Sequence, residues 1–418
     1  MKKYCVIGKS LPHTLSPQIH AMFGRPDYGV REFANKAELA KFVKGGEYGG
    51  YNVTIPYKQD VIPLLDAVSQ SAKEIGAVNT VVNENGKNVG YNTDIDGISY
   101  AFRKANIELE GRNILILGSG GTCLTAKYVC ERDGAQSVKV VSRTGEINYE
   151  NCYGLQDAQV IINTTPVGMY PNIYESPLDL SRFQNLQGVY DCIYNPLQTM
   201  LVKQARDLGI NAANGLVMLV EQARIAHNLF QRAKGLKEVS ELKTDEIVRA
   251  ITEERRNIVL IGMAGSGKSV IGKAVAKRLG REFADTDAEV ENAAGMSIAD
   301  IFAAFGEEKF RDLERGAVER VCSKLGLVIA TGGGAILDEK NRFYMEANGV
   351  RVLIRRPVEQ LATAGRPLSD SAEKAAALYE LRKPLYHESA DIIIDNDGDA
   401  ESAVNLLLAK LGFAKVEV

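Results

Sequence analysis

Short apolar runs that end in glycine are the clearest pattern along this chain. Asn113–Leu117 precedes the turn Gly118–Gly121, and Asn257–Ile261 precedes the turn Gly262–Gly267. Such runs are typical of strands that are buried on both faces of a parallel sheet. A helix is predicted to follow each turn, which gives an α/β organisation that occurs at least twice.

Further apolar runs follow both turns. After the first turn they lie at residues 138–141, 159–162 and 188–191, and after the second at 326–330, 350–354 and 391–394. Helical or loop segments separate them, as a doubly wound sheet requires. We therefore expect two separate open sheets rather than one large sheet.

The boundary between the two parts is predicted between Gln222 and Asn257. Thr244 is predicted to cap a helix from Asp245 to about Glu254. We place the cut near Glu254, which gives parts 1–254 and 255–418, and a cut near residue 235 stays open.

Composition narrows the function classes. The chain has 418 residues, with 50 Lys and Arg against 53 Asp and Glu, and this balance argues against a general binder of nucleic acid or membrane surfaces. No apolar run approaches the ~18–20 residues of a membrane span, and the start lacks a signal-peptide core. The six cysteines contain no C-x-x-C pair and suit a reducing compartment, so we expect a cytoplasmic protein.

The second glycine turn matches the phosphate-binding pattern G-x-x-x-x-G-K-[ST] in full, after a strand and before a helix. Its residues are Gly262, Met263, Ala264, Gly265, Ser266, Gly267, Lys268 and Ser269. Backbone N–H groups of such a loop wrap a polyphosphate at a helix N-terminus. Lys268 is predicted to reach the β- and γ-phosphates of ATP, and Ser269 to bind Mg²⁺.

Polar motifs follow the phosphate loop in a fixed order. They are Asp285-Thr-Asp287, Gly306–Arg311, Thr331-Gly332-Gly333-Gly334, Gly365-Arg366-Pro367-Leu368 and Arg382–Asp391. Each alone has an ordinary structural explanation, but together this series resembles the shikimate kinase family over nearly all of residues 256–418. The resemblance implies a P-loop kinase α/β domain.

The resemblance also implies a role for each motif. Asp285 would help to hold Mg²⁺, and Asp287 would bind and orient the acceptor hydroxyl. Arg311 and Arg382 would clamp the substrate carboxylate, and Arg366 would be a lid arginine over the transferred phosphoryl group. The backbone of the loop formed by Gly332, Gly333 and Gly334 would approach the substrate. The lid, Leu361–Arg366, is shorter than is usual and has only this arginine.

In the first part, Gly118, Ser119, Gly120 and Gly121 form a dinucleotide-type turn, although Cys123 stands where a third glycine is usual. The next strand is followed by Ser142, Arg143 and Thr144. An arginine stands where NAD-binding proteins usually have a carboxylate that accepts a hydrogen bond from the ribose 2′-hydroxyl. An arginine can instead bind a 2′-phosphate, which points to NADP(H).

Loop-rich polar clusters surround this nucleotide fold. They are Leu15–His20, Asn52–Lys58, Gly76–Thr80, Gly90–Gly97, Asn163–Met169, Asp191–Thr199 and Gly215–Gln222. In this order they resemble the shikimate dehydrogenase family over roughly residues 1–254. The resemblance implies a substrate domain at about 1–98 and 217–254, and a Rossmann-like NADP domain at about 99–216.

The resemblance implies that Lys58 and Asp94 are a catalytic dyad, with Lys58 as proton donor. The other implied contacts are Thr14 and Ser16 to the carboxylate, Thr54, Asn79, Tyr194 and Gln222 to ring hydroxyls, and Gly215 and Met218 near the nicotinamide. Thr14 stands where serine is usual, which could tune the choice between shikimate and quinate. Glu146 stands near a usual second basic position, so the preference for NADP could be less strict.

Together the two resemblances predict a bifunctional enzyme of the shikimate pathway. It would reduce 3-dehydroshikimate with NADPH and then phosphorylate shikimate with ATP and Mg²⁺. Two alternatives stay open: a quinate dehydrogenase fused to a kinase of other specificity, and a metabolite-sensing regulator with inactive enzyme folds.

Overall fold

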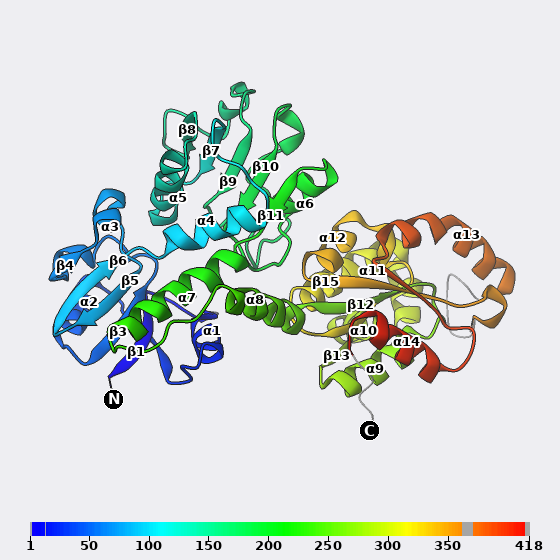
Figure 1. Ribbon diagram of the computed structural model, residues 1–418. Coiled ribbons are helices and arrows are strands. Elements are labelled where there is room, and N and C mark those ends of the chain that lie inside the picture. The colour runs from blue at the N-terminus through cyan, green and yellow to red at the C-terminus, as the bar shows by residue number, and fades with distance from the viewer. Residues whose placement is uncertain (1, 13, 362–370, 414–418) are drawn as a thin grey trace. The chain divides into compact units, whose positions relative to one another are not determined.

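The computed structural model describes residues 2–12, 14–361 and 371–413 (Figure 1). The chain divides into two compact units. Unit 1 comprises Met1–Met169, Glu175–Tyr194 and Leu201–Ile251. Unit 2 comprises Tyr170–Tyr174, Asn195–Met200 and Thr252–Val418.

Unit 1 begins with a six-stranded mixed sheet in the order β2-β1-β3-β5-β6-β4. Its strands are β1 Lys3–Gly8, β2 Tyr28–Glu32, β3 Tyr48–Val53, β4 Ala67–Val68, β5 Thr80–Glu84 and β6 Lys87–Tyr91. Its helices are α1 Ser16–Met22, α2 Lys36–Lys44 and α3 Gln70–Ile75, with the 3₁₀ turn η1 Ile62–Leu64. The apolar runs predicted two sheets, so this third sheet is a correction.

Strand β3 shows why the pattern missed this sheet. Its sequence, Tyr-Gly-Gly-Tyr-Asn-Val, has no continuous apolar run. A Cβ on Gly50 would overlap the ring of Phe230, which packs on β3 from far along the chain. The glycine is therefore required by tertiary packing, and no local periodicity reveals it.

The second sheet of unit 1 is parallel, in the order β11-β10-β9-β7-β8. Its strands are β7 Asn113–Leu117, β8 Ser137–Val141, β9 Val160–Asn163, β10 Gly188–Asp191 and β11 Asn211–Ala213. The accompanying elements are α5 Gly121–Arg132, α6 Met200–Asp207, η2 Cys152–Gly154 and η3 Leu180–Arg182. Strand β7 lies between β8 and β9, so the winding reverses there, and a ligand crevice is expected at the carboxyl ends of these strands.

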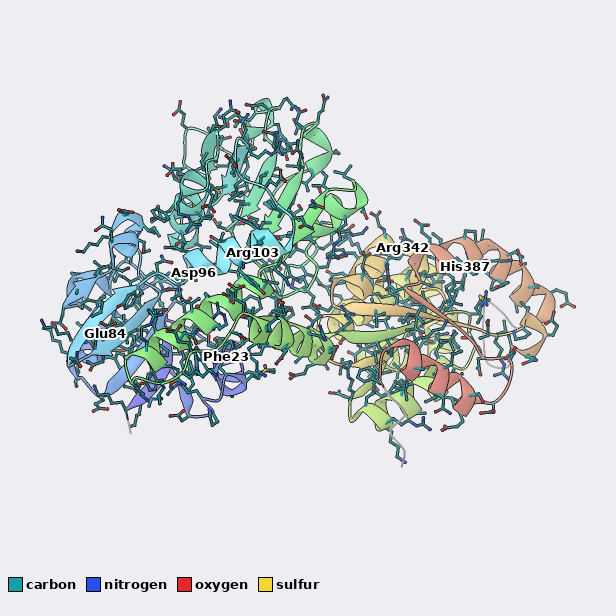
Figure 2. All side chains as sticks on the ribbon, in the orientation of Figure 1. Phe23, Glu84, Asp96, Arg103, Arg342 and His387 are labelled. Atoms are coloured by element: carbon teal, nitrogen blue, oxygen red, sulfur yellow. The ribbon has the colours of Figure 1, made fainter. Side chains whose placement is uncertain are left out.

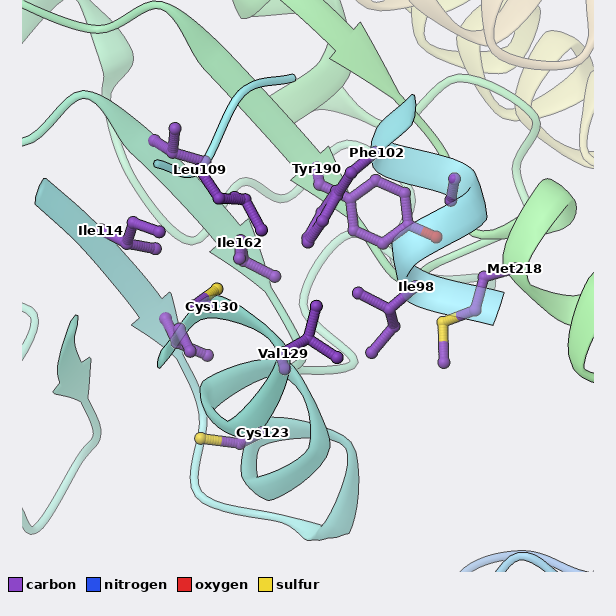
Figure 3. Packing of buried hydrophobic residues seen from close by; sticks show 14 of the residues in the cluster. Ile98, Phe102, Leu109, Ile114, Cys123, Val129, Cys130, Ile162, Tyr190 and Met218 are labelled. Atoms are coloured by element: carbon purple, nitrogen blue, oxygen red, sulfur yellow. The ribbon is translucent and has the colours of Figure 1, made fainter. Parts of the chain in front are cut away.

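Helices α4 Asp94–Lys104 and α7 Leu216–Arg232 pack against each other. Phe102 of α4 meets Tyr190 of β10 edge to face, with ring centroids 5.1 Å apart, in the core that also contains Val129 of α5 (Figure 3). Helix α8 Leu242–Arg255 follows α7. The predicted cap Thr244 was wrong, because α8 begins earlier and the buried Thr244 hydroxyl donates to Glu221 of α7 at 2.6 Å.

Unit 2 contains a parallel sheet in the order β13-β14-β12-β15-β16. Its strands are β12 Asn257–Ile261, β13 Phe283–Asp285, β14 Val328–Ala330, β15 Gly349–Arg355 and β16 Ile392–Asp395. Its helices are α9 Lys268–Leu279, α10 Thr286–Ala294, α11 Ile298–Cys322, α12 Glu339–Ala347, α13 Ala372–Ser389 and α14 Ala400–Lys410, with η4 Ala335–Leu337 and η5 Val358–Gln360. The predicted strands before both glycine turns are confirmed as β7 and β12.

Two short segments from the middle of the chain belong to unit 2. Ile173 is buried in its core beside Phe343 and Tyr344 of α12. The backbone N–H of Gln198 donates to the carbonyl of Ala347 at 2.8 Å, and its side chain donates to Glu346 at 2.6 Å. The core of unit 2 is therefore completed by residues far upstream of β12.

The cysteines are all free thiols. Five are buried and Cys192 is half-buried. No helix among the described residues has the length and apolar character that a membrane span needs.

Ile173→Ala is predicted to destabilise unit 2. Removing a buried isoleucine side chain costs about 2–4 kcal/mol through lost burial and the cavity left behind. Denaturant unfolding followed by Cys322 exposure measures this loss, since Cys322 lies in the same core. The matched control Leu406→Ala, at a half-exposed position of α14, should cost less than about 1 kcal/mol. Equal effects of the two variants would contradict a core role for Ile173.

Candidate active sites

Lys58 and Asp94 come together in unit 1. Lys58 follows β3, and Asp94 is the first residue of α4. The Lys58 Nζ lies 2.6 Å from the Asp94 Oδ2, and their side chains are only 13% and 6% exposed. A buried ion pair needs further hydrogen bonds to offset the loss of hydration.

Asn79 supplies one of these bonds. Its Nδ2 donates to Asp94 Oδ1 at 2.8 Å, while its Oδ1 accepts from the backbone N–H of Thr93 at 2.7 Å. Because that N–H can only donate, the amide orientation of Asn79 is fixed. Asp94 thus receives a donor on each carboxylate oxygen.

A series of buried, hydrogen-bonded side chains connects Asn79 to Tyr28. Tyr28 donates to Asn52 Oδ1 at 2.6 Å, Asn52 Nδ2 donates to Thr80 at 2.9 Å, and Thr80 donates to Asn79 Oδ1 at 3.1 Å. The motif analysis quoted Asn52 and Thr80 without giving them a role, and it missed Tyr28. No local signal marks Tyr28, because its partners come from other strands.

A pocket opens beside the ion pair. Nine predicted residues line it: Ser16, Thr54, Lys58, Asn79, Asp94, Tyr194, Gly215, Met218 and Gln222. Thr14 is absent from this lining, but its hydroxyl donates to the Ser16 Oγ at 3.2 Å. None of the described histidines lines the pocket, and His387 is exposed on α13 of unit 2 (Figure 2). Among the described residues that line this pocket, Lys58 is the one basic side chain.

The Gly118–Gly121 turn lies at the carboxyl end of β7. Gly118 has φ +107°, a conformation that favours glycine. Helix α5 begins at this turn with neither a side-chain cap nor an acidic residue in its first turn, as a site for a pyrophosphate requires. A Cβ built on Gly121 would lie 3.4 Å from Lys58 Cδ, so this turn adjoins the ion pair.

Ser142, Arg143 and Thr144 follow β8 directly. The backbone N–H of Gly118 donates to the carbonyl of Val141 at 2.9 Å, which joins the glycine turn to the end of β8. Arg143 and Thr144 are exposed. The donor set at this sheet edge therefore fits a dinucleotide with a ribose phosphate.

In unit 2 the phosphate loop connects β12 to α9. Gly267 has φ +98° and α9 has no side-chain cap, so its first N–H groups suit a phosphate. Lys268 Nζ donates to the carbonyls of Gly262 and Met263, both at 2.8 Å. Ser269 donates to Asp285 Oδ2 at 2.7 Å, which brings together the hydroxyl and carboxylate predicted to hold Mg²⁺.

The loop of three glycines lies between two groups of predicted site residues. A Cβ on Gly332 would crowd the carboxylates of Asp287 and Glu314, one on Gly333 would lie 2.9 Å from the backbone N of Ala264, and one on Gly334 would overlap the guanidinium of Arg311. Each glycine thus faces a different partner. A side chain at any of the three positions would therefore collide with one of these partners.

The two predicted carboxylate-binding arginines have different partners. Arg311 donates to Glu314 at 2.7 Å and to Glu307 at 2.9 Å. Arg382 is buried and its Nη1 donates to the carbonyl of Gly333 at 3.2 Å. Arg366 lies outside the described residues.

The sequence analysis missed Glu314 and Asn396, and it included Tyr386 in a motif without giving it a role. Buried Glu314 orients Arg311, Tyr386 donates to the carbonyl of Gly333 at 2.5 Å, and Asn396 Nδ2 donates to the carbonyl of Ser266 at 2.7 Å. Burial raises the pKa of Glu314, and burial followed by the charge of Asp285 raises the pKa of Asp287. The spacing of Glu314, three residues after Arg311 on one helix, is a signal that could have identified it.

Two family models match the chain: the shikimate dehydrogenase substrate binding domain at residues 6–81, and shikimate kinase at residues 264–411. The shikimate dehydrogenase (NADP(+)) of Caldicellulosiruptor bescii is 38% identical in an alignment of 256 positions that covers 53% of this chain and 87% of the relative. The shikimate dehydrogenase (NADP(+)) of Geobacillus kaustophilus is 37% identical in an alignment of 251 positions that covers 54% of this chain and 91% of the relative.

Solved structures of shikimate dehydrogenases are also similar to this chain. A chorismate mutase/shikimate 5-dehydrogenase fusion protein from Clostridium acetobutylicum has 33% identity and a TM-score of 0.56, over 60% of this chain and 98% of that chain. A shikimate 5-dehydrogenase from Thermus thermophilus, in complex with NADP(H) and shikimate, has 28% identity and a TM-score of 0.52, over 60% of this chain and 99% of that chain. The chain therefore belongs to the shikimate dehydrogenase family, carries a shikimate kinase domain in its second half, and joins an oxidoreductase to a kinase.

Proposed function

We propose that this chain catalyses two consecutive steps: NADPH-dependent reduction of 3-dehydroshikimate to shikimate, and ATP-dependent phosphorylation of shikimate to shikimate 3-phosphate. Residues 1–254 carry the first step and residues 255–418 the second. The observation that carries the proposal is the buried Lys58–Asp94 pair, which opens onto a pocket lined by the predicted substrate residues. The ketone reduced in the first step becomes the hydroxyl phosphorylated in the second.

In the first step, Lys58 Nζ donates a proton to the ketone oxygen, and Asp94 orients Lys58. Thr14 and Ser16 bind the substrate carboxylate, and the side chains of Thr54, Asn79, Tyr194 and Gln222 bind its hydroxyl groups. NADPH, when bound, supplies the hydride. Backbone N–H groups at the start of α5 bind its pyrophosphate, Arg143 its 2′-phosphate, and Gly215 and Met218 border its nicotinamide.

In the second step, Asp287 accepts a hydrogen bond from the acceptor hydroxyl and orients it. Arg311 and Arg382 clamp the carboxylate, as their planar guanidinium groups suit. Lys268 and Arg366 neutralise charge on the transferred phosphoryl group. Ser269 and Asp285 would hold Mg²⁺, which would supply positive charge against the negative charge of the transferred phosphoryl group. The free, buried thiols suit a reducing cytoplasm.

Lys58→Met is predicted to abolish ketone reduction while phosphorylation stays near normal. The variant keeps the length of the side chain but removes its proton, and loss of a general acid costs about 10²–10⁴ in rate. Separate steady-state assays of the two reactions on the same preparation measure this. The control Lys36→Met alters an exposed lysine and should leave both rates unchanged. Reduction at more than about half the wild-type rate would exclude Lys58 as the acid.

NADPH is predicted to be preferred over NADH, because Arg143 stands where a carboxylate would favour NADH. Arg143→Gln should lower kcat/KM for NADPH about tenfold and leave the value for NADH nearly unchanged, as one charge-assisted hydrogen bond is lost. Arg103→Gln, at an exposed position of α4, is the control. Equal kcat/KM values for both cofactors in the wild-type enzyme would contradict this assignment.

Arg382→Ala is predicted to raise the KM for shikimate about 10–100-fold, because the substrate carboxylate loses a charged partner. It leaves no buried carboxylate unpaired, unlike Arg311→Ala, which would strand Glu314. Lys268→Met and Arg366→Ala should instead lower kcat with a modest change in KM. Arg320→Ala, an exposed substitution on α11, is the control. A fall in kcat at unchanged KM in Arg382→Ala would remove that arginine from the carboxylate clamp.

A further inference from the structure

Thr125 is a buried hydroxyl that neither reaction uses directly. It lies on α5, between Cys123 and Val129 of the apolar cluster shown in Figure 3, and is fully buried. A hydroxyl in such surroundings costs free energy unless it is hydrogen-bonded. Its partners are therefore informative.

The Thr125 Oγ1 donates to the carbonyl of Gly121 at 3.2 Å and accepts from the Nδ2 of Asn92 at 3.1 Å. A carbonyl can only accept and an amide NH₂ can only donate, so the direction of both bonds is determined. The bond to Gly121 spans one helical turn, which fixes the rotamer of Thr125 and aims its free lone pair at Asn92.

Asn92 continues the connection to Asp94. Its Oδ1 accepts from the backbone N–H of Asp94 at 3.1 Å, and its Nδ2 also donates to the carbonyl of Ala77 at 3.0 Å. Asn92 is itself buried. Two side chains thus connect the last glycine of the Gly118–Gly121 turn to the backbone of the residue that pairs with Lys58.

This connection joins two places whose separation matters for hydride transfer. The glycine turn sets the position of a bound dinucleotide, and the Lys58–Asp94 pair sets the position of the ketone oxygen. Reacting atoms must approach to about 3–3.5 Å, and small displacements are costly in rate. A fixed length between Gly121 and Asp94 therefore fixes the donor–acceptor distance.

We propose that Thr125 is a positioning residue for ketone reduction, acting through Asn92 to hold Asp94 at a set distance from the nucleotide turn. This inference rests on the proposed function of residues 1–254. It assigns Thr125 no contact with substrate or cofactor. A change at Thr125 does not remove the other hydrogen bond of Asn92, to the carbonyl of Ala77.

The test is a series of Thr125 variants in the full chain. Thr125→Val keeps the shape and removes the hydroxyl, Thr125→Ser keeps the hydroxyl, and Thr125→Ala removes both hydroxyl and methyl. Wild-type reduction of 3-dehydroshikimate is measured first, since its absence would refute the proposed function and not the role of Thr125. Shikimate phosphorylation by the same preparations reports on the integrity of unit 2, and the melting temperature reports on unit 1.

For Thr125→Val we expect kcat of reduction to fall about tenfold, with KM for 3-dehydroshikimate and Kd for NADPH within about twofold of wild type. The deuterium isotope effect with 4-deuterated NADPH should rise, because hydride transfer becomes more rate-limiting. Hydrogen exchange of the Asp94 amide in the ligand-free protein should accelerate. Thr125→Ser should restore all three readouts.

The proposal is overturned if Thr125→Val leaves kcat, the isotope effect and Asp94 exchange unchanged. It is also overturned if Thr125→Ser is as impaired as Thr125→Val, since the methyl group and not the hydroxyl would then matter. Should Thr125→Val fail to fold, the comparison of Thr125→Ser with Thr125→Ala isolates the hydroxyl. Equal rates and equal Asp94 exchange in those two variants would refute the proposal.

Discussion

The ion pair of Lys58 and Asp94 is buried, and the rest of the substrate-binding region is arranged around that constraint. Taking two charges out of water is offset only when good geometry and further hydrogen bonds accompany their attraction. Asn79 satisfies the second carboxylate oxygen, and Asn92 accepts the backbone N–H of Asp94. Lys58 follows β3, Asn79 precedes β5, Asn92 follows β6 and Asp94 begins α4, so these bonds tie together the ends of four elements.

In unit 2 the corresponding constraint is a loop of three glycines, in which there is no space for side chains. Gly332, Gly333 and Gly334 each occupy a place where a Cβ would meet a functional group. Tyr386 and Arg382 then bind the carbonyl of Gly333 from α13. Close backbone approach lets one loop lie against Ala264 of the phosphate loop, Asp287 and Arg311 together.

The sequence predicted those parts whose signal is local. Strands β7 and β12 were predicted because their apolar runs are continuous. Lys58 and Asp94 were singled out by compact motifs that resemble those of the shikimate dehydrogenase family, and the structure brings the two side chains together. The apolar pattern missed the first sheet because glycine interrupts it in β3. Gly50 is required there by the ring of Phe230, which packs on β3 but is remote in sequence. Tyr28 and Thr125 were missed for the same kind of reason: their hydroxyl groups act through partners on other elements. No local signal marks Ile173 as a core residue, because the other buried members of its cluster begin at Val259.

The distribution of cysteines has a practical consequence. Five lie in unit 1, whereas unit 2 has only Cys322, in the core that includes Ile173. Burial raises the pKa of the Cys322 thiol to about 12, and the thiolate is the reactive form. Cys322 thus resists alkylation until its surroundings open. Its labelling rate reports the local stability of unit 2 separately from that of unit 1, which gives the chain an intrinsic and site-specific probe of how independently its two units unfold.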